Sequence, residues 1–337
     1  MKVLVTGGAG YIGSHTVLEL LTAGHEVVVT DNLTNSTQLS IERVEKITNK
    51  KVPFHPVDVC DAVAMRKVFS LYLFDAVIHF AGLKSVDESL SHPVDYYRTN
   101  VGGTINLCRI LKDFSIKYFI FSSSATVYGA PKFLPITESA HLSPTNPYGH
   151  SKLMAEQIIR DFQHSVAGAS VGILRYFNPA GAHPSGQIGE DPRGVPANLL
   201  PFVAQVAMGL REAVNVYGND YDTTDGTGVR DYVHVVDLAQ GHICALDTMV
   251  AGSTCFTCNL STGHGYSVIE IINAFSQACG RKLPYKIKPR RLGDIAECYA
   301  DPNYANKLLG WQAQRGIKEM CQDIWHWQVS NPTGYKQ

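Results

Sequence analysis

The sequence has no excess of basic residues and no long hydrophobic run, and both absences narrow the classes of protein to consider. Lys and Arg total 29 against 30 Asp and Glu, for a formal net charge of -1, so no basic surface is indicated for nucleic acid. The apolar run nearest the N-terminus, Val3–Val5, is shorter than a signal-peptide core, and no stretch is long enough to span a bilayer. We expect a cytoplasmic protein that binds neither nucleic acid nor a membrane.

The cysteines lack the arrangement that a metal site or a disulfide framework needs. Eight are scattered from Cys60 to Cys321, and the Cys-x-x-Cys pair formed by Cys255 and Cys258 has no second pair and no histidine at ligand spacing beside it. We predict ordinary buried thiols in a reducing compartment, and no metal.

The chain does contain an alternation of short apolar runs with segments of helical apolar spacing. Continuous apolar strands are typical of a parallel sheet covered on both faces, so the predicted fold class is α/β, a Rossmann-type doubly wound parallel sheet with a smaller C-terminal substrate-binding lobe. Strands are expected at 2–6, 26–30, 52–57, 76–80, 118–121 and 171–174, and helices near 12–23, 61–72, 93–113 and 148–164.

The pattern loosens beyond residue 176 into stretches rich in Pro and Gly, such as 178–186 and 222–228. A length of 337 residues allows two domains, with a cleft between them where small molecules bind. We predict a Rossmann domain over 1–176 and a substrate lobe over 177–337. The strand-like segment 231–236 is expected to return to the first sheet, which would interleave the two.

A glycine triplet follows the first predicted strand. Gly7, Gly10 and Gly13 are spaced Gly-x-x-Gly-x-x-Gly where that strand should meet a helix, and such glycines let the backbone approach a pyrophosphate at the helix N-terminus. The second strand ends in Asp31, whose carboxylate can accept hydrogen bonds from an adenosine ribose and would repel a 2′-phosphate. The motif predicts NAD rather than NADP, and Asn32 in place of an arginine agrees with that choice.

Two more strand ends should line the same cofactor, because ligands bind at the carboxyl ends of strands in such sheets. Asp58 ends the third strand, where it could accept a hydrogen bond from the adenine amino group, and residues 79–82 end the fourth. For Asp58 an alternative stays open, that it caps the helix beginning near Asp61.

The second chemical signal is Tyr148-x-x-x-Lys152. Asn146 is a good N-cap and Pro147 a favoured first helical residue, so the tyrosine and the lysine are predicted to share one helix face. With an ordinary pKa near 10, a phenol is a poor base at neutral pH, a deficit of about 4 kcal/mol. A nearby ammonium, an oxidised nicotinamide and a helix N-terminus all favour the phenolate.

Ser124 and Thr126 follow the fifth predicted strand in the segment Ser-Ser-Ser-Ala-Thr. At the sheet edge they could hold a substrate hydroxyl against Tyr148. A second Tyr-x-x-x-Lys at 128–132 is not expected to form a helix, because a proline precedes its lysine.

These motifs together resemble the extended short-chain dehydrogenase/reductase superfamily, and four further motifs resemble the UDP-glucose 4-epimerase family within it. The likeness runs along the whole chain. It implies an NAD-dependent isomerase that epimerises UDP-hexoses at C4 through a transient 4-keto sugar, as a homodimer packed through the helices near 93–113 and 148–164. The four further motifs lie at 80–84, 176–179, 226–232 and 289–294.

The resemblance also implies roles for single residues. Tyr148 would take the proton of the sugar 4-hydroxyl, Lys152 would hold the nicotinamide ribose and depress the tyrosine pKa, and Ser124 would orient the hydroxyl. Thr99 stands where some relatives have Asn, a departure beside the cofactor. The implied cofactor contacts are Gly7, Gly10, Tyr11, Ile12, Gly13, Asp31, Asn32, Asp58, Val59, Phe80, Ala81, Lys84, Asn100, Ser122, Tyr148, Lys152 and Phe177. The implied UDP-sugar contacts are Ser124, Thr126, Tyr148, Asn178, Asn198, Leu199, Tyr217, Arg230, Arg291, Asp294 and Cys298.

Cys298 is the most informative variable position. In the family, a tyrosine there restricts the sugar pocket to glucose and galactose, whereas a small residue leaves room for a 2-acetamido group. Cysteine is small, so we predict activity on the N-acetylated UDP-hexoses as well as on the plain ones. The alternative is that Cys298 is only a buried thiol.

Two other functions stay open. A nucleotide-sugar 4,6-dehydratase would share the cofactor and the Tyr-Lys pair, but it needs an acid–base carboxylate pair just after the serine segment, where Ala125 and Thr126 stand. A non-catalytic NAD-binding sensor would keep the glycine loop without needing Ser124, Tyr148 and Lys152 together. Products of turnover on nucleotide sugars distinguish the three.

Overall fold

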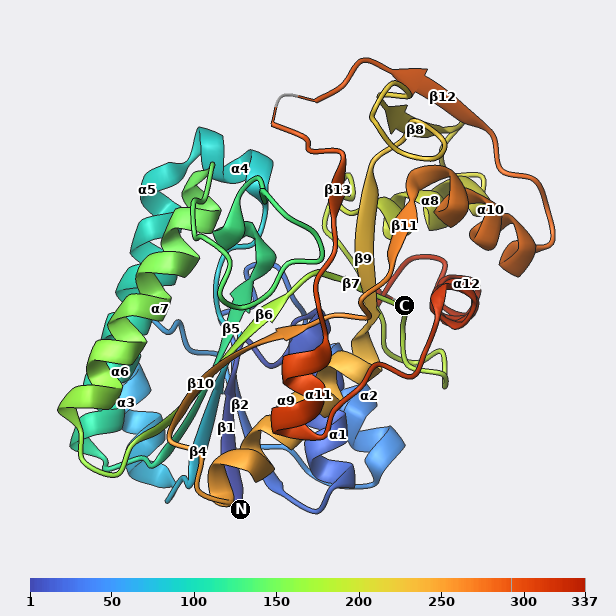
Figure 1. Ribbon diagram of the computed structural model, residues 1–337. Coiled ribbons are helices and arrows are strands. Elements are labelled where there is room, and N and C mark those ends of the chain that lie inside the picture. Colours follow the sequence, from blue (N-terminus) through green and yellow to red (C-terminus); the bar gives the residue numbers. More distant parts are fainter. Residues whose placement is uncertain (292, 337) are drawn as a thin grey trace.

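The central element of the chain is a seven-stranded sheet in which every neighbouring pair is parallel (Figure 1). The computed structural model describes residues 1–291 and 293–336. The strand order is β10-β6-β5-β4-β1-β2-β3, and the predicted Rossmann-type fold is confirmed. The strands are β1 (Lys2–Thr6), β2 (Glu26–Thr30), β3 (Phe54–His55), β4 (Ala76–His79), β5 (Tyr118–Ser124), β6 (Ser170–Tyr176) and β10 (Cys255–Leu260).

Helices cover both faces of this sheet, which explains why strand interiors such as Val3–Val5 are apolar without alternation and fully buried. One face packs on α1 (Tyr11–Thr22), α2 (Leu39–Thr48), α9 (Val235–Val250) and α11 (Asn303–Leu309). The other face packs on α3 (Ala62–Leu71), α6 (Gly103–Asp113) and α7 (Pro147–Ser165), at the left of Figure 1.

Residues 93–113 do not form the single regular helix that was expected. They form α5 (Pro93–Tyr96), a π-helical segment η1 (Tyr97–Gly102) and α6. Such π segments occur frequently at functional sites, because they change the direction of side chains within a helix. The remaining short helices near the sheet are α4 (Val86–Ser91) and the 3-10 turn η2 (Ala125–Tyr128), so the tyrosine and lysine of 128–132 do not share a helix.

The smaller lobe lies at the upper right of Figure 1 and has an apolar core of its own. Its four-stranded sheet contains β7 (Asn178–Ala180), β9 (Val229–His234), β11 (Gly265–Ser267) and β13 (Glu297–Cys298). A two-stranded sheet pairs β8 (Val214–Tyr217) with β12 (Tyr285–Lys288), and the helices are α8 (Leu199–Ala207), α10 (Val268–Cys279) and α12 (Ile317–Ser330).

The prediction that 231–236 returns to the first sheet is wrong. Residues 231–234 belong to β9 in the smaller sheet, where the Asp231 carboxylate accepts hydrogen bonds from the N–H groups of Thr262 and Gly263. The chain then forms α9 and returns to the large sheet as β10, which pairs with β6.

Among the described residues, no helix is long and apolar enough to cross a membrane, and no three His, Cys, Asp or Glu side chains are arranged to hold a metal ion. All eight cysteines are free thiols. The expectation that they are all buried is wrong, because Cys255 is exposed at the first residue of β10 and Cys60, Cys244, Cys279 and Cys298 are only partly buried.

Candidate active site

The glycine triplet forms the tight turn between β1 and α1. Gly7 has a φ of +69°, and a Cβ atom there would lie 2.6 Å from the backbone nitrogen of Ala81. A Cβ on Gly13 would lie 2.3 Å from the Gly7 carbonyl oxygen. Gly10, the N-cap of α1, adds no side-chain acceptor, which leaves the first N–H groups of the helix for an anion. The turn therefore fits a dinucleotide pyrophosphate.

Asp31 directly follows β2 beside this turn. Its carboxylate accepts hydrogen bonds from the Ala9 N–H (3.1 Å) and from the Ser36 hydroxyl (2.7 Å). The charge therefore ties the glycine turn to the loop after β2 and lies where an adenosine ribose is expected.

Asp58 lies next along the rim and is not a helix cap. Asp61 caps α3 instead, so that alternative is wrong. The Asp58 carboxylate accepts hydrogen bonds from the Asn32 amide (3.0 Å) and the Cys60 N–H (2.8 Å). Burial raises the pKa of Asp58, but these hydrogen bonds outweigh it and hold the pKa below its ordinary value. The contact with adenine stays a prediction.

Asn100 lies in the π-helical segment and holds the chain that follows β4. Its side chain accepts a hydrogen bond from the Leu83 N–H (2.8 Å), and donates to the Leu83 carbonyl (3.0 Å) and to the Ser151 hydroxyl (2.9 Å). The buried amide thus joins residues 80–84 to α7. Its direct contact with the cofactor stays a prediction.

The other predicted cofactor residues lie along the same edge of the sheet. They follow β1, β3, β4 and β6 or lie in β5, so the parallel order brings them together although they span most of the first half of the chain. These residues are Tyr11, Ile12, Val59, Phe80, Ala81, Ser122 and Phe177.

Lys84 contacts Glu190, a residue that the sequence motifs do not identify. Its ammonium pairs with Glu190 at 2.9 Å, and the same oxygen of Glu190 accepts a hydrogen bond from Asn198 (2.9 Å). Glu190 therefore joins a predicted cofactor residue to a predicted substrate residue. It lies in a loop without periodicity, so neither spacing nor pattern could have identified it.

Tyr148, Lys152 and Ser124 meet where α7 passes the end of β5. Asn146 caps α7 as predicted, accepting a hydrogen bond from the Gly149 N–H (2.9 Å). The Lys152 ammonium donates to the Ser122 carbonyl (2.8 Å) and lies 6.0 Å from the centroid of the Tyr148 ring. Thr126 donates its hydroxyl to the Ser124 oxygen (3.0 Å), so both predicted hydroxyls stand at this edge.

The electrostatics of the pair are set by burial. Burial raises the pKa of Tyr148, and the Ser124 hydroxyl lowers it by less. Burial lowers the pKa of Lys152 to about 8, while the charge of Glu156 opposes that change. The lysine is therefore still mostly cationic at neutral pH, and the phenol depends on nearby positive charge to lose its proton.

A cavity of about 530 Å³ lies between the sheet edge and the smaller lobe. Arg230 and Arg291 line it together with three acidic side chains, Asp87, Glu190 and Asp294, and Arg291 is paired with Asp294 at 2.9 Å. Paired guanidinium groups suit a diphosphate. The cavity brings together seven predicted substrate residues, which are Asn178, Asn198, Leu199, Tyr217, Arg230, Arg291 and Asp294.

Tyr221 also lines this cavity and was not predicted. It is 7% exposed, and its hydroxyl has no hydrogen-bond partner within the part of the chain that the structure describes. The Arg290 guanidinium lies 4.0 Å from its ring centroid. A buried hydroxyl without a partner in a cavity wall indicates a ligand contact, and the only sequence signal is its place just before the 226–232 motif.

Cys298 lies outside the lining of the cavity, on β13 opposite Arg230 in the sheet register. It is partly buried and packs on an apolar cluster that includes Val127 and Phe177, the residues next to Thr126 and Asn178. Burial raises the pKa of the thiol to about 11. This predicted sugar contact therefore has a small, neutral side chain, but it does not line the cavity.

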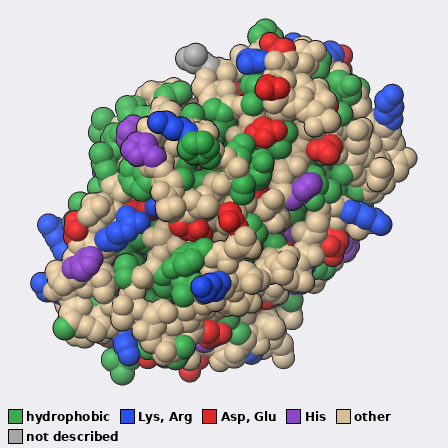
Figure 2. Space-filling model, in the orientation of Figure 1, with side chains coloured by type: hydrophobic (Ala, Val, Ile, Leu, Met, Phe, Trp, Pro, Cys, Tyr) green, Lys and Arg blue, Asp and Glu red, His purple; other side chains and the backbone are tan. Residues whose placement is uncertain are grey.

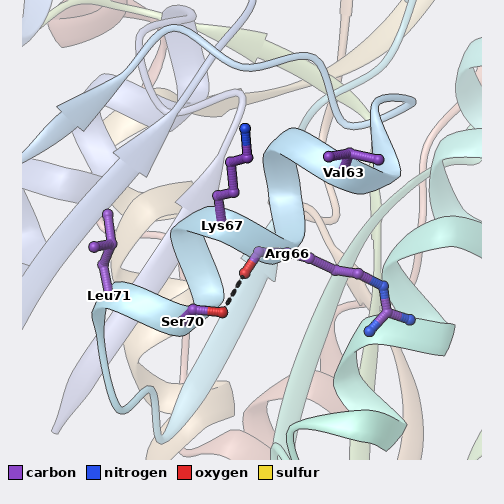
Figure 3. A pocket seen from close by; sticks show the side chains of 5 residues that line it. All are labelled: Val63, Arg66, Lys67, Ser70 and Leu71. Atoms are coloured by element: carbon purple, nitrogen blue, oxygen red, sulfur yellow. Dashed lines mark hydrogen bonds between the residues drawn. The ribbon is translucent and has the colours of Figure 1, made fainter.

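A second hollow, on the outer face of α3, has no such features. Figure 3 shows side chains that fan out from one helix instead of converging on a point. The Ser70 hydroxyl donates a hydrogen bond to the Arg66 carbonyl of its own helix (2.9 Å). The lining residues are Val63, Arg66, Lys67, Ser70 and Leu71, and we assign them no ligand.

Known proteins resemble the chain over its whole length. A family model described as GDP-mannose 4,6 dehydratase matches residues 4–324. The UDP-glucose 4-epimerase of Bacillus subtilis (strain 168) is 55% identical over 336 residues, which cover 100% of this chain and 99% of that protein. The solved UDP-glucose 4-epimerase of Bifidobacterium longum, in complex with NAD+ and UDP, has a TM-score of 0.96 and 53% identity, covering 99% of this chain and 100% of that one. The UDP-Glc/GlcNAc 4-epimerase of Campylobacter jejuni has a TM-score of 0.85 and 36% identity, with 98% and 99% covered.

Proposed function

The chain belongs to the UDP-glucose 4-epimerase family, and from that membership we propose a role for each residue of the site. The activity is the NAD-dependent 4-epimerisation of UDP-glucose and UDP-galactose. The observation that carries these roles is the position of Tyr148 and Lys152 together at the end of β5. Neither they nor Ser124 and Thr126 line the cavity of the two arginines, but Ser124 pairs in the sheet with Tyr176, two residues before the cavity residue Asn178. The residues of the sheet edge would hold NAD, which would supply a reversible hydride acceptor for C4 of the sugar.

The glycine turn and the strand ends hold the cofactor in this proposal, with Asp31 on the adenosine ribose. Tyr148 moves the proton at the 4-oxygen of the sugar, and Ser124 orients that hydroxyl. Lys152 supplies the positive charge that favours the phenolate. Arg230 and Arg291 hold the diphosphate, so that the hexose can turn while the nucleotide stays anchored.

The dehydratase chemistry in the family model's description is not supported by these residues. Eliminating water needs a carboxylate pair after Ser124, and the next residues are the Ala125 and Thr126 of η2. The carboxylate of Glu156, which lies behind this edge, is fully engaged by Arg175 and Ser123.

We further propose that the sugar site accepts the N-acetylated UDP-hexoses. The support is the small neutral side chain of Cys298, which packs on the apolar cluster next to the predicted sugar contacts Thr126 and Asn178, where a tyrosine would take up more room. The fold is compatible with such a substrate, since the Campylobacter jejuni relative is described as a UDP-Glc/GlcNAc epimerase.

The direct test is to incubate the purified protein with UDP-galactose and, separately, with UDP-N-acetylgalactosamine, without added reductant, and to resolve each product from its C4 epimer. Conversion of both is expected. Conversion of UDP-galactose alone would support the epimerase activity and contradict the proposal that N-acetylated substrates are accepted. A 4-keto-6-deoxy product would indicate a dehydratase, and a folded, NAD-loaded sample without turnover would indicate a sensor.

We also propose a homodimer packed through the helices at the left of Figure 1. Leu90, Val94 and Met154 are exposed on α4, α5 and α7, and hydrophobic side chains gather at the upper left of the surface over these helices (Figure 2). Exposed apolar side chains grouped in this way indicate a protein interface.

Sedimentation should give twice the chain mass of 36.9 kDa. Val94→Glu combined with Met154→Glu should give the monomer, because two charges would be buried without partners. Val329→Glu is the matched control, since Val329 is similarly exposed but lies on α12 in the smaller lobe. A monomeric wild type, or a Val329 variant that dissociates as readily, would contradict this arrangement.

A further inference from the structure

A cluster of buried charge lies directly behind the Tyr148–Lys152 pair and has no role in the function proposed above. Glu156 lies on α7 one turn beyond Lys152, so that the tyrosine, the lysine and the glutamate form one stripe on the helix. Arg175, near the carboxyl end of β6, is its main partner. Both side chains are at least 98% buried, with exposures of 0% and 2%.

Both oxygens of the Glu156 carboxylate are fully used. Oε1 accepts hydrogen bonds from Arg175 Nε (2.9 Å) and from the Ser123 hydroxyl (2.6 Å). Oε2 accepts from a terminal nitrogen of Arg175 (2.7 Å) and from Arg160 (2.9 Å). Burial raises the pKa of Glu156, but the hydrogen bonds and the charge of Arg175 outweigh it and hold the pKa below its ordinary value.

Arg175 is also fixed on its far side. It donates to the Tyr128 hydroxyl (2.8 Å), which donates to Asn259 (2.7 Å). The Asn259 amide donates to the Ile136 carbonyl (3.1 Å), and the Ile136 N–H donates to the carbonyl of the residue after Cys298 (2.9 Å). A continuous set of hydrogen bonds therefore runs from the helix of the Tyr-Lys pair to Tyr299, the residue that follows β13.

Stability alone does not account for such a cluster. Replacing a buried ion pair by apolar residues of similar size is often neutral or stabilising, whereas fixed charges admit only one geometry. The contact at Ser123 shows where that geometry matters. Its neighbour Ser122 accepts the hydrogen bond of Lys152, and its neighbour Ser124 faces Tyr148.

We propose that Glu156 is a positioning residue, which sets the register of α7 against the end of β5 through Ser123. Arg175 holds the carboxylate in place, and the register in turn places the Tyr-Lys pair opposite residues 122–124. The inference rests on the proposed catalytic roles of that pair. A shift of the helix along the strand would misplace the base by a fraction of a turn, and misplacement of about 1 Å can cost a hundredfold in rate.

Ser123→Ala is the appropriate variant, because removing Glu156 would leave Arg175 buried without a partner and could unfold the protein. The alanine removes one hydroxyl contact and leaves the ion pair. We expect kcat on UDP-galactose to fall about tenfold, with little change in KM, since the nucleotide contacts are untouched. The control is Thr257→Val, which removes the hydroxyl that accepts from Arg160 (3.1 Å) on the other side of the cluster and should keep the wild-type kcat.

Rapid mixing with UDP-galactose, followed by the absorbance of reduced nicotinamide, shows which step changes. The Ser123 variant should reduce its bound cofactor more slowly than wild type and the Thr257 variant at the wild-type rate, with thermal midpoints alike in both variants. An unchanged kcat in Ser123→Ala overturns the proposal, as does an equal loss in both variants or a change in KM alone. A wild-type protein without epimerase activity would instead overturn the function itself, so the two failures are distinguishable.

Discussion

Tyr148→Phe is expected to lower kcat for UDP-galactose epimerisation about a thousandfold, within the range of general acid–base catalysis. The phenylalanine keeps the ring that packs edge-on against Tyr96 at 6.3 Å and removes only the oxygen that carries the proton. The Lys152 ammonium keeps its hydrogen bond to the Ser122 carbonyl, so the helix should not move. Steady-state kinetics, with the NAD content of the purified variant measured after denaturation, check the result.

The affinity for UDP should stay at the wild-type value, because the arginines that line the cavity lie in the other lobe. Tyr304→Phe is the matched control, since it removes a hydroxyl from an exposed tyrosine on α11, and it should leave kcat unchanged. A loss of less than tenfold in Tyr148→Phe would mean that another group moves the proton. A fall in NAD content parallel to the fall in kcat would mean that the tyrosine holds the cofactor instead.

The cofactor edge could be predicted from sequence because its signals are local. The glycine triplet, Asp31 and the Tyr-Lys pair each occupy one turn or one helix, and their spacing alone determines which side chains lie together. The helix cap at Asn146 is of the same kind. Apolar runs predict where strands form, but they do not predict which sheet a strand joins. Segment 231–236 was therefore assigned to the wrong sheet.

The residues that sequence reasoning missed are those whose partners are far along the chain. Glu156 and Arg175 lie on a helix and a strand, and nothing in their spacing shows that they form an ion pair. Glu190 and Tyr221 lie in loops without periodicity, where backbone turns rather than patterns decide which way a side chain points. Burial and hydrogen bonding in three dimensions are needed to identify them.

Cys298→Tyr is expected to lower kcat/KM for UDP-N-acetylgalactosamine selectively. Its backbone is paired with Arg230 in the parallel ladder, so a larger side chain cannot escape by moving the strand. The phenol ring would have to occupy space beside Val127 and Phe177, the neighbours in sequence of the predicted sugar contacts Thr126 and Asn178. Overpacking of this kind costs about 1–3 kcal/mol, which is roughly a five- to hundredfold loss in kcat/KM for the bulkier sugar.

The plain hexose has a hydroxyl where the N-acetylated sugar has its acetamido group, so kcat/KM for UDP-galactose should change little in Cys298→Tyr. Cys298→Ser is the control for size, because serine is as small as the neutral thiol and should keep both activities. Equal loss on the two substrates in the tyrosine variant would place residue 298 against a part of the site that both sugars share. No loss on either would mean that the side chain faces the apolar cluster instead of the substrate, leaving Cys298 a buried thiol. A ratio of kcat/KM values that falls only for the N-acetylated sugar would identify this strand as the wall that selects the substrate.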